Sequence, residues 1–300
     1  MTLEQLRIFV AVAERQHVTE AARALNLAQS AASHAIAALE ARHDTKLFNR
    51  VGRRIELTEA GQVFLTEARA VLAHVEVAEL VLSEFGNLER GTLSIQASQT
   101  IAGYWLPRHI VAFRRAYPQI QVRLAIGNTA QVAAAVERGM AELGFVEGVV
   151  DGDHFDCTPV ARDQLVVVVG QEHPWIGRAQ LAPQDLLESE WVLREAGSGT
   201  RSAFEDALAH LGLDPGALHI QLELPSNEAV RAAVEAGLGA TAISASVAAP
   251  SIEAELLQQV AFHLPEREFY VLRHRERYRS RAAETLLALV VRSPVVGGIG

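Results

Sequence analysis

The chain has 300 residues, 49% of them hydrophobic and 21% charged, and a formal net charge of −9. This length suits two domains, and the composition is that of a folded protein rather than a disordered one. No apolar run approaches the roughly 18–20 residues of a membrane span, and the N-terminus lacks the pattern of a signal peptide. Cys157 is the only cysteine, which excludes an intrachain disulfide and a cysteine-rich metal cluster. We therefore expect a cytoplasmic protein without metal or cofactor.

Charge is unevenly distributed along the first ninety residues. Seven cations and three anions between Arg15 and Arg54 give +4, whereas two cations and seven anions between Ile55 and Arg90 give −5. A basic block within an acidic protein indicates a local surface that faces phosphates. A solvated charged loop is the simpler alternative.

The first forty residues predict three helices. Apolar residues from Leu3 to Ala13 lie on one face at helical spacing. Thr19 is placed to cap a second helix, Glu20–Leu25, and Asn26-Leu27 interrupts before a third helix from about Ala28 to His43. Two short helices, a tight break and a third helix are typical of a helix-turn-helix, in which the third helix enters the major groove.

The third helix carries polar side chains opposite its apolar residues Ile36 and Leu39. These side chains are short or amide-bearing and suit base edges and phosphates: Gln29, Ser30, Ser33 and His34. The alternative is an ordinary solvated helix face.

Residues 47–57 predict a β-hairpin. Apolar residues flank a glycine-containing tip that is rich in arginine. Arg50, Arg53 and Arg54 would lie beside the phosphate backbone, where they position the third helix without reading sequence.

A long helix is predicted from Thr58 to about Phe85. Its apolar residues alternate by four and three, as in a coiled coil: Phe64, Ala68, Val71, Val75, Ala78, Leu82 and Phe85. Such a helix can pack on its own domain, but dimerisation is favoured here because two-fold pairing presents two recognition helices to a pseudo-palindromic site.

The remaining two hundred residues predict an α/β domain. Strand and helix patterns alternate in chain order over 91–97, 101–116, 120–126, 128–139 and 143–146, with further strands at 164–170 and 191–193 and a helix at 202–211. Ligands of such sheets bind beyond the carboxyl ends of the strands, against helix N-termini.

Two predicted helix starts are candidate anion sites. Ser98-Gln99-Thr100 follows the first strand, and Gly197–Arg201 follows the strand at 191–193. Backbone N–H groups and hydroxyls at a helix start favour an anion, and Arg201 could add positive charge. Either start alone also fits an ordinary helix cap. Residues 197–200 lack the Gly-Lys-Ser/Thr ending of a phosphate-binding P-loop.

The first 65 residues resemble the signature of LysR-type transcriptional regulators. The matching segments, in order and at the family's spacing, are Leu6-Arg7-Ile8-Phe9, Thr19-Glu20-Ala21-Ala22, Leu27–Ser33, Leu39-Glu40, Leu47-Phe48-Asn49-Arg50 and Leu57–Gly61. Ala28 departs from the pattern, because many relatives have a serine there that caps the recognition helix. Such a cap contributes on the order of 1 kcal/mol.

The resemblance implies a fold and partners for the whole chain. The expected fold is an N-terminal all-α winged helix-turn-helix with a long linker helix, and a C-terminal α/β two-lobed domain like periplasmic binding proteins. The implied boundaries are 1–58, 59–90 and 91–300, with lobe I at 91–162 and 267–300 and lobe II at 163–266. The implied partners are double-stranded DNA, a small-molecule effector, and further copies of the chain in dimers and tetramers.

The same resemblance places the effector in a cleft between the lobes. The residues expected to face it are Ser98, Thr100, Thr129, Glu147, Ser198 and Thr200. The sequence around Ser98 and Gly197 looks closest to the branch of the family linked to sulfur metabolism. This resemblance suggests a sulfur oxyanion as the effector. Glu147 argues against a bare anion unless it is turned away or protonated.

An enzyme and a solute-binding module are the alternative functions for such a chain. An enzyme would need a nucleophile elbow, metal-ligand spacing or a dinucleotide fingerprint, and the sequence has none of these. A solute-binding module of an uptake system conflicts with the missing signal peptide and the fused DNA-binding unit. The histidines, including His109, are expected to be surface or core residues. The basic segment Arg273–Arg279 is expected to be a solvated turn rather than a DNA contact, and the tail 295–300 to be disordered.

Overall fold

The structure is a computed structural model that describes residues 1–51, 54–85 and 91–292. The chain divides into two compact units, Met1–Phe85 and Gly86–Gly300. No helix among the described residues is both long and apolar enough to cross a membrane. The expected tail disorder concerns residues that lie outside this description.

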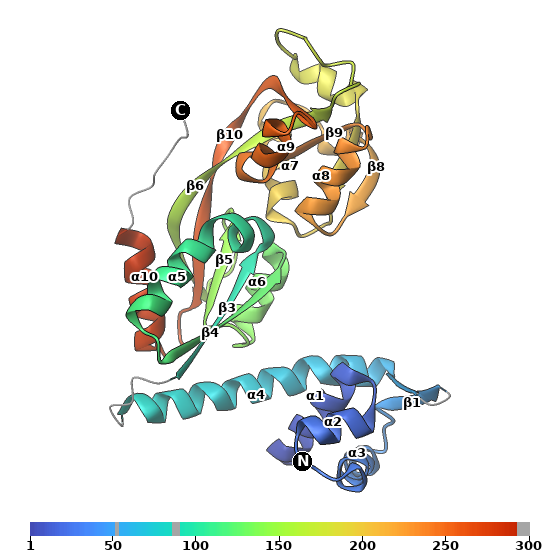
Figure 1. Cartoon of the computed structure of the whole chain (residues 1–300), viewed down its shortest axis with the longest axis vertical. Coiled ribbons are helices and arrows are strands. Elements are labelled where there is room, and N and C mark those ends of the chain that lie inside the picture. The colour runs from blue at the N-terminus through green and yellow to red at the C-terminus, as the bar shows by residue number, and fades with distance from the viewer. Residues whose placement is uncertain (52–53, 86–90, 293–300) are drawn as a thin grey trace. The chain divides into compact units, whose positions relative to one another are not determined.

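The first unit is a winged helix-turn-helix followed by a long helix (Figure 1). Its elements are α1 (Leu3–Arg15), α2 (Val18–Ala24), α3 (Gln29–His43), β1 (Phe48–Val51), β2 (Arg54–Leu57) and α4 (Glu59–Phe85). Asn26 adopts a positive φ of 57° in the break between α2 and α3. β1 and β2 pair antiparallel, with Phe48 opposite Leu57, so the predicted hairpin is confirmed.

The predicted start of the second helix is wrong by two residues. α2 begins at Val18, and the helix cap is His17 rather than Thr19. The Nδ1 atom of His17 accepts a hydrogen bond from the backbone N–H of Glu20 at 3.4 Å. A histidine ring nitrogen fills a role usually taken by a hydroxyl or carboxylate, which is why the sequence pattern favoured the threonine.

Phe9 organises the core of the first unit. It is fully buried, and its ring lies 5.5 Å from that of Phe48 in the hairpin and 4.8 Å from that of Phe64 in α4. Phe9 of α1 thus contacts both the hairpin and the long helix. Burial of one large apolar side chain contributes about 1.5–3 kcal/mol, so this contact fixes the hairpin relative to the three helices.

The second unit contains one eight-stranded sheet in the order β4-β3-β5-β10-β6-β9-β7-β8. Its strands are β3 (Gly91–Ser98), β4 (Ile120–Gly127), β5 (Leu143–Glu147), β6 (Phe155–Gly170), β7 (Glu190–Arg194), β8 (His219–Leu224), β9 (Ala240–Ser244) and β10 (Leu257–His274). The helices are η1 (Ile101–Trp105, a π-helical turn), α5 (Leu106–Ala116), α6 (Thr129–Glu137), η2 (Pro183–Glu188), α7 (Gly199–His210), η3 (Pro215–Ala217), α8 (Asn227–Glu235), α9 (Ala245–Glu253) and α10 (Arg281–Arg292).

Two long strands join the two halves of this sheet. β6 and β10 run antiparallel through the middle, with β3, β4 and β5 on one side and β7, β8 and β9 on the other. In each half the outer strands pair parallel to one another. Asp163 and Arg267 pair across the two long strands, where the family resemblance implies the change of lobe. This is the two-lobed fold with two crossover strands that was expected.

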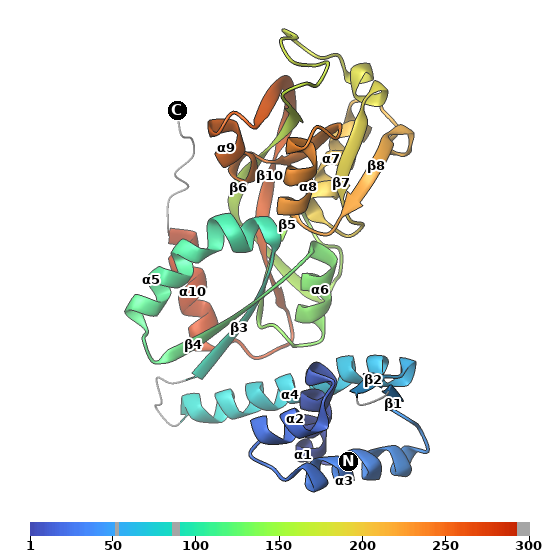
Figure 2. The same ribbon diagram turned by 45° about the vertical axis from the view of Figure 1, so that its right-hand side comes forward.

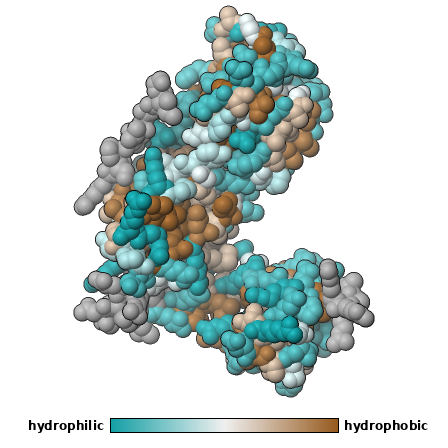
Figure 3. Space-filling model, viewed as in Figure 1, coloured by the Kyte–Doolittle hydropathy of each residue, from teal (hydrophilic) through white to brown (hydrophobic). Residues whose placement is uncertain are grey.

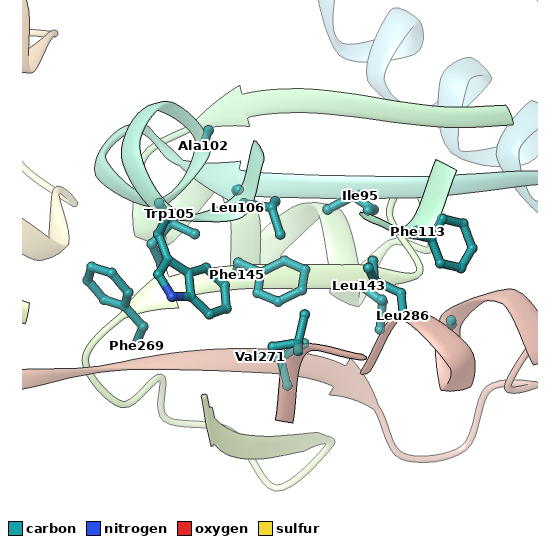
Figure 4. Packing of buried hydrophobic residues seen from close by; sticks show 14 of the residues in the cluster. Ile95, Ala102, Trp105, Leu106, Phe113, Leu143, Phe145, Phe269, Val271 and Leu286 are labelled. Atoms are coloured by element: carbon teal, nitrogen blue, oxygen red, sulfur yellow. The ribbon is translucent and has the colours of Figure 1, made fainter. Parts of the chain in front are cut away.

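Helices cover both faces of each half-sheet (Figures 1 and 2). In lobe I, Phe145 packs with α5 and α10, whereas its neighbour Val146 packs with α6 on the other face. Figure 4 shows the first of these clusters, in which the ring of Trp105 lies 6.0 Å from Phe145 and 6.1 Å from Phe269. In lobe II, α7 covers one face, and α8 and α9 cover the other.

Local sequence patterns predict only part of the two crossover strands. The predicted strand at 164–170 is the last part of β6, and β10 was not predicted. Register shifts interrupt the pairing between His263 and Glu266, at Pro265, and next to Pro159. Proline cannot donate a ladder hydrogen bond, so it weakens the strand signal and occurs at such bulges.

Candidate DNA-binding and effector-binding sites

The recognition helix α3 presents most of its predicted side chains to solvent. Gln29, Ser30 and His34 are exposed and Ser33 is half-buried, whereas Ala32 on the opposite face is fully buried. The Gln29 side-chain amide donates to the Ser33 hydroxyl at 2.8 Å, so these two residues already contact each other one turn apart. No side chain caps the helix at Ala28, as the departure from the family pattern implied.

Glu40 attaches α3 to the hairpin, a role that the sequence analysis missed. Its side chain accepts hydrogen bonds from the N–H groups of Leu47 at 2.9 Å and Phe48 at 3.3 Å, and from Lys46 Nζ at 2.7 Å. Burial raises the pKa of Glu40, but these hydrogen bonds outweigh it and hold the pKa below its usual 4.5. A charged group thus fixes the start of the wing to the recognition helix.

The three wing arginines are only partly covered by the structure. Arg50 and Arg54 lie on β1 and β2, and Arg50 pairs with Ile55. Their side chains, and the whole of Arg53, lie outside the described part of the chain. Their phosphate contacts stay a prediction.

The predicted seam of α4 is divided between two environments. Ala68 is 1% exposed, and Phe64 packs on Phe9 of the same unit. Val71 is 41% exposed and Val75 half-buried. Packing within the unit therefore accounts for the first two positions, and Val71, Val75 and Ala78 stay candidates for dimerisation. The side chains of Leu82 and Phe85 lie outside the described residues.

In lobe I, Ser98 and Thr100 stand where β3 ends and the next helical segment begins. Both are 2% exposed. The Ser98 Oγ atom has no hydrogen-bond partner among the described residues. Thr100 Oγ1 accepts a hydrogen bond from Asn227 Nδ2 of lobe II at 3.1 Å. The two lobes therefore touch at this helix start.

In lobe II, Ser198 and Thr200 stand at the start of α7 and are also 2% exposed. Thr200 Oγ1 accepts a hydrogen bond from Arg267 Nη1 of β10 at 3.1 Å. A Cβ at Gly199 would lie 2.6 Å from Thr129 Oγ1 and 2.7 Å from the Glu147 carbonyl, both in lobe I. Only glycine permits this approach, so the start of α7 lies directly against the other lobe.

Thr129 and Glu147 contact each other. The Thr129 hydroxyl donates to Glu147 Oε2 at 3.3 Å, and Glu147 Oε1 lies 4.0 Å from Arg267 Nη2. Glu147 is 4% exposed. Its carboxylate thus faces a hydroxyl donor and a guanidinium, both of which offer it hydrogen-bonding or charge compensation.

Arg201 does not join the other candidate effector residues. Its guanidinium donates to Glu205 Oε1 at 2.7 Å, one turn along α7, and to Glu223 of β8. The hydrogen bonds that it donates to these carboxylates, first of all to Glu205, raise the pKa of Arg201. The i,i+4 pairing with Glu205 draws the side chain along its own helix, so the expectation that Arg201 supplies charge to the cleft is not supported.

The buried cations near the predicted cleft are Arg194 and Arg267 instead. Arg267 is 7% exposed and Arg194 is 4% exposed. Arg267 Nε donates to Asp163 Oδ2 at 2.8 Å, and Arg194 pairs with Glu195 at 2.7 Å. Sequence reasoning missed Arg267 because its partner Asp163 is 104 positions away and becomes visible only once β6 and β10 are paired. It missed Arg194 because nothing in the neighbouring pair Arg194-Glu195 indicates that the arginine is buried at the end of β7.

Other basic and histidine residues have structural roles. Arg275 and Arg279 pair with Asp156, and Arg277 donates to the carbonyls of Val136 and Glu137. The basic segment therefore fastens the last turn to lobe I. His109 is 5% exposed, and burial lowers its pKa, as for a core histidine.

A separate cavity of about 710 Å³ in lobe II contains a histidine–serine pair. His173 Nε2 lies 3.1 Å from Ser189 Oγ, while its Nδ1 accepts from the N–H of Trp175. Burial lowers the pKa of His173. The neutral ring therefore carries its proton on Nε2 and donates to the serine, so it cannot act as a base toward that hydroxyl.

A groove-reading unit joined to a two-lobed ligand-binding fold defines a transcriptional regulator with an effector-binding domain. Residues 3–62 match the model described as a bacterial regulatory helix-turn-helix protein of the lysR family, and residues 86–294 match the LysR substrate binding domain. The chain belongs to the LysR family of transcriptional regulators, and it is accordingly not an enzyme.

Known proteins resemble the chain over most of its length. A probable RuBisCO transcriptional regulator of Cyanophora paradoxa is 33% identical over 305 residues, which cover 98% of this chain and 94% of that protein. Full-length CbnR in complex with its target DNA has a TM-score of 0.70 at 23% identity, covering 97% and 98% of the two chains. The regulatory domain of Synechocystis PCC6803 CcmR in complex with 2-PG has a TM-score of 0.61 at 25% identity, covering 67% of this chain and 96% of that one.

Proposed function

We propose that this LysR-type regulator binds operator DNA through α3 and the wing, and that a small anionic effector bound between the lobes of its second unit controls it. A sulfur oxyanion is our first candidate for the effector. The proposed effector residues are Ser98, Thr100, Ser198 and Thr200, with Thr129, Glu147 and Arg267 supporting them.

The observation that carries the effector proposal is the hydroxyl of Ser98. It is buried at the start of a helical segment, and its Oγ atom lacks a partner among the described residues. Buried polar groups are nearly always hydrogen-bonded, so an unsatisfied one calls for a ligand or a water molecule. Because helix N-termini favour negative charge, an anion suits this position. The CcmR regulatory domain in complex with 2-PG supports a small molecule as the ligand of such a domain.

Isothermal titration calorimetry on the full-length protein tests this proposal. The ligands are sulfite, sulfate, phosphate and succinate. We expect at least one to bind, and Ser98→Ala to weaken its binding about tenfold, since a lost hydrogen bond to a charged group is worth about 1.5–3 kcal/mol. Ser202→Ala, at an exposed position on α7, is the matched control and should leave binding unchanged. Absence of heat with all four ligands would contradict the anionic effector.

We further propose that the chain acts as a dimer, or as a tetramer of two dimers. On the α4 seam, the exposed Val71 and the half-buried Val75 support pairing of the first unit. On the face shown in Figure 3, hydrophobic side chains gather over the region of α5 and α10, where Val111 is 49% and Val291 is 60% exposed. Exposed apolar surface of this kind is typical of a protein–protein contact.

A further inference from the structure

Thr100 and Thr200, on opposite lobes, have the same hydrogen-bond polarity. Thr100 Oγ1 accepts from Asn227 Nδ2, and Thr200 Oγ1 accepts from Arg267 Nη1. An amide nitrogen and a guanidinium can only donate. Each threonine oxygen therefore acts as an acceptor toward its neighbour, which leaves its O–H to donate elsewhere. Neither hydroxyl finds an acceptor within the described part of the chain.

A buried chain of contacts fixes the polarity at Thr100. Arg194 binds Glu195 with two nitrogens, Nε at 2.7 Å and Nη2 at 2.9 Å, and its Nη1 donates to Asn227 Oδ1 at 2.5 Å. Because the guanidinium has no acceptor, the Asn227 amide must turn its oxygen toward Arg194 and its nitrogen toward Thr100. Asn227 is 1% exposed, and its backbone N–H donates to Gln99 Oε1 at 2.9 Å, so the residue is held on two sides.

Glu195 keeps this chain charged. Burial raises the pKa of Glu195, but hydrogen bonds from Arg194 and Asn128 outweigh burial and hold the pKa below its ordinary value. The carboxylate is ionised at neutral pH and continues to orient Arg194.

A second buried chain of contacts fixes the polarity at Thr200. Asp163 Oδ2 lies 2.8 Å from Arg267 Nε and 2.7 Å from its Nη2, and Asp163 Oδ1 accepts from the Ser244 hydroxyl at 2.6 Å. The ion pair leaves Nη1 of Arg267 directed at Thr200. Each chain thus runs from a carboxylate through an arginine to a threonine hydroxyl. In both, a carboxylate compensates the arginine's charge. Arg267 Nη2, although 2.7 Å from Asp163 Oδ2, makes no hydrogen bond among the described residues, so this end of the site presents that N–H as a donor beside the Thr200 hydroxyl.

We propose that these two chains of contacts, here called relays, orient the hydroxyls of Thr100 and Thr200 as hydrogen-bond donors toward the effector. The effector is thereby restricted to molecules that present only hydrogen-bond acceptors at this site. The first relay is Glu195–Arg194–Asn227–Thr100 and the second is Asp163–Arg267–Thr200. The inference rests on the proposed effector site and names the chemical class within it. A fully deprotonated oxyanion meets both hydroxyl donors. An amide or protonated acid of the same shape brings a donor against a donor, which leaves buried groups unsatisfied.

Calorimetry with matched ligands tests the class. Sulfate is compared with sulfamide, and succinate with succinamide, on the full-length protein. We expect the anion to bind at least tenfold more tightly than its neutral amide. If an anion and its amide bind equally tightly, the proposed role of the relays is overturned, whereas the proposed effector site is not. If sulfite, sulfate, phosphate and succinate all fail to bind, the proposed anionic effector is overturned, and the relays with it.

A double-mutant cycle separates hydrogen-bond polarity from charge. Asn227→Asp places a carboxylate beside Thr100. The carboxylate accepts a hydrogen bond from the Thr100 hydroxyl, so the O–H turns toward residue 227 and no longer toward the effector. Its added negative charge also weakens anion binding, but that effect persists when the hydroxyl is absent. The affinity is measured for the anion that binds most tightly. We expect the factor by which Asn227→Asp lowers this affinity to be at least fivefold larger in the wild-type background than in the Thr100→Val background.

An equal loss in the two backgrounds would mean that charge alone is responsible and would overturn the relay through Asn227. Circular dichroism and operator binding of each variant confirm that the protein is folded. Thr100→Ser, which retains the hydroxyl, should keep anion affinity within about twofold of wild type and preserve the preference for the anion over its amide. Loss of that preference in Thr100→Ser would indicate a purely structural role for the threonine.

Discussion

At the scale of single residues, Glu40 shows how one buried carboxylate fixes the DNA-reading unit. It joins α3 to the start of the wing through two backbone N–H groups and Lys46. Glu40→Gln keeps the shape but replaces one acceptor oxygen by a donor. We expect a loss of about 1–3 kcal/mol in the free energy of unfolding of this unit, measured by urea denaturation. Glu20→Gln, at an exposed position, is the control and should change stability little.

The same contact predicts a pH dependence of known sign. The pKa of Glu40 in the folded protein lies below its ordinary 4.5. The folded state therefore binds fewer protons than the unfolded state, so the contact stabilises above pH 4.5 and loses its effect as the pH falls through the folded pKa. The stability difference between wild type and Glu40→Gln should narrow as the pH falls below 4.5. A difference that stays constant from pH 7 to pH 3 would contradict the charge-based account.

Residues of the recognition helix and of the wing should differ in what they contribute to DNA binding. Gln29→Ala should reduce discrimination between operator and mutated operators, since one good bidentate base contact is worth about 1–3 kcal/mol. Arg53→Ala should weaken binding to every duplex and lower the salt slope by about one unit. Fluorescence anisotropy over a salt series measures both. Identical behaviour of the two variants would show that the division into base and phosphate contacts is wrong.

At the scale of elements, Gly61 determines how closely α4 approaches the wing. A Cβ at this position would lie 2.2 Å from the Leu47 carbonyl oxygen. Alanine in a helix is ordinarily favoured over glycine by about 1 kcal/mol, but here a backbone atom blocks the methyl group. Gly61→Ala should therefore destabilise the first unit, lowering its thermal midpoint. Gly103→Ala, which meets no atom within 4 Å, is the matched control and should be neutral or stabilising.

The exposed part of α4 predicts self-association. Val71→Asp introduces charge at an exposed seam position, whereas Val63→Asp does so at a position outside the seam that is 65% exposed. We expect Val71→Asp to raise the dimer dissociation constant at least tenfold in analytical ultracentrifugation, and Val63→Asp to leave it unchanged. Equal effects of the two would remove α4 from the dimer interface.

Local patterns predicted most elements, and the failures have identifiable causes. The helix-turn-helix, the hairpin and the strands at 91–97 and 143–146 follow from periodicity and short-range contacts. β10 was missed because Pro265 and the bulges of a strand that serves both lobes disturb its pattern. The buried Arg267 could not be predicted from local sequence, because its ion-pair partner Asp163 is 104 positions away. Arg201 is beside the predicted anion site in sequence, but its side chain pairs with Glu205 along its own helix.

At the scale of the whole molecule, regulation requires that the effector site influence DNA binding. Within the second unit, the lobes contact each other through Gly199 against Glu147 and through Asn227 against Thr100. A ligand that takes hydrogen bonds from both lobes therefore changes the balance between their closed and open arrangements. It can shift DNA affinity only by the difference between its affinities for those two states.

The most direct test of the account measures fluorescence anisotropy of the full-length protein on a labelled duplex from upstream of its own gene. We predict binding at low ionic strength that is tighter than to a scrambled duplex, that falls steeply with salt, and that changes when the effector anion is added. Equal affinity for the two duplexes, or no binding to either, would contradict the proposal that α3 and the wing read an operator.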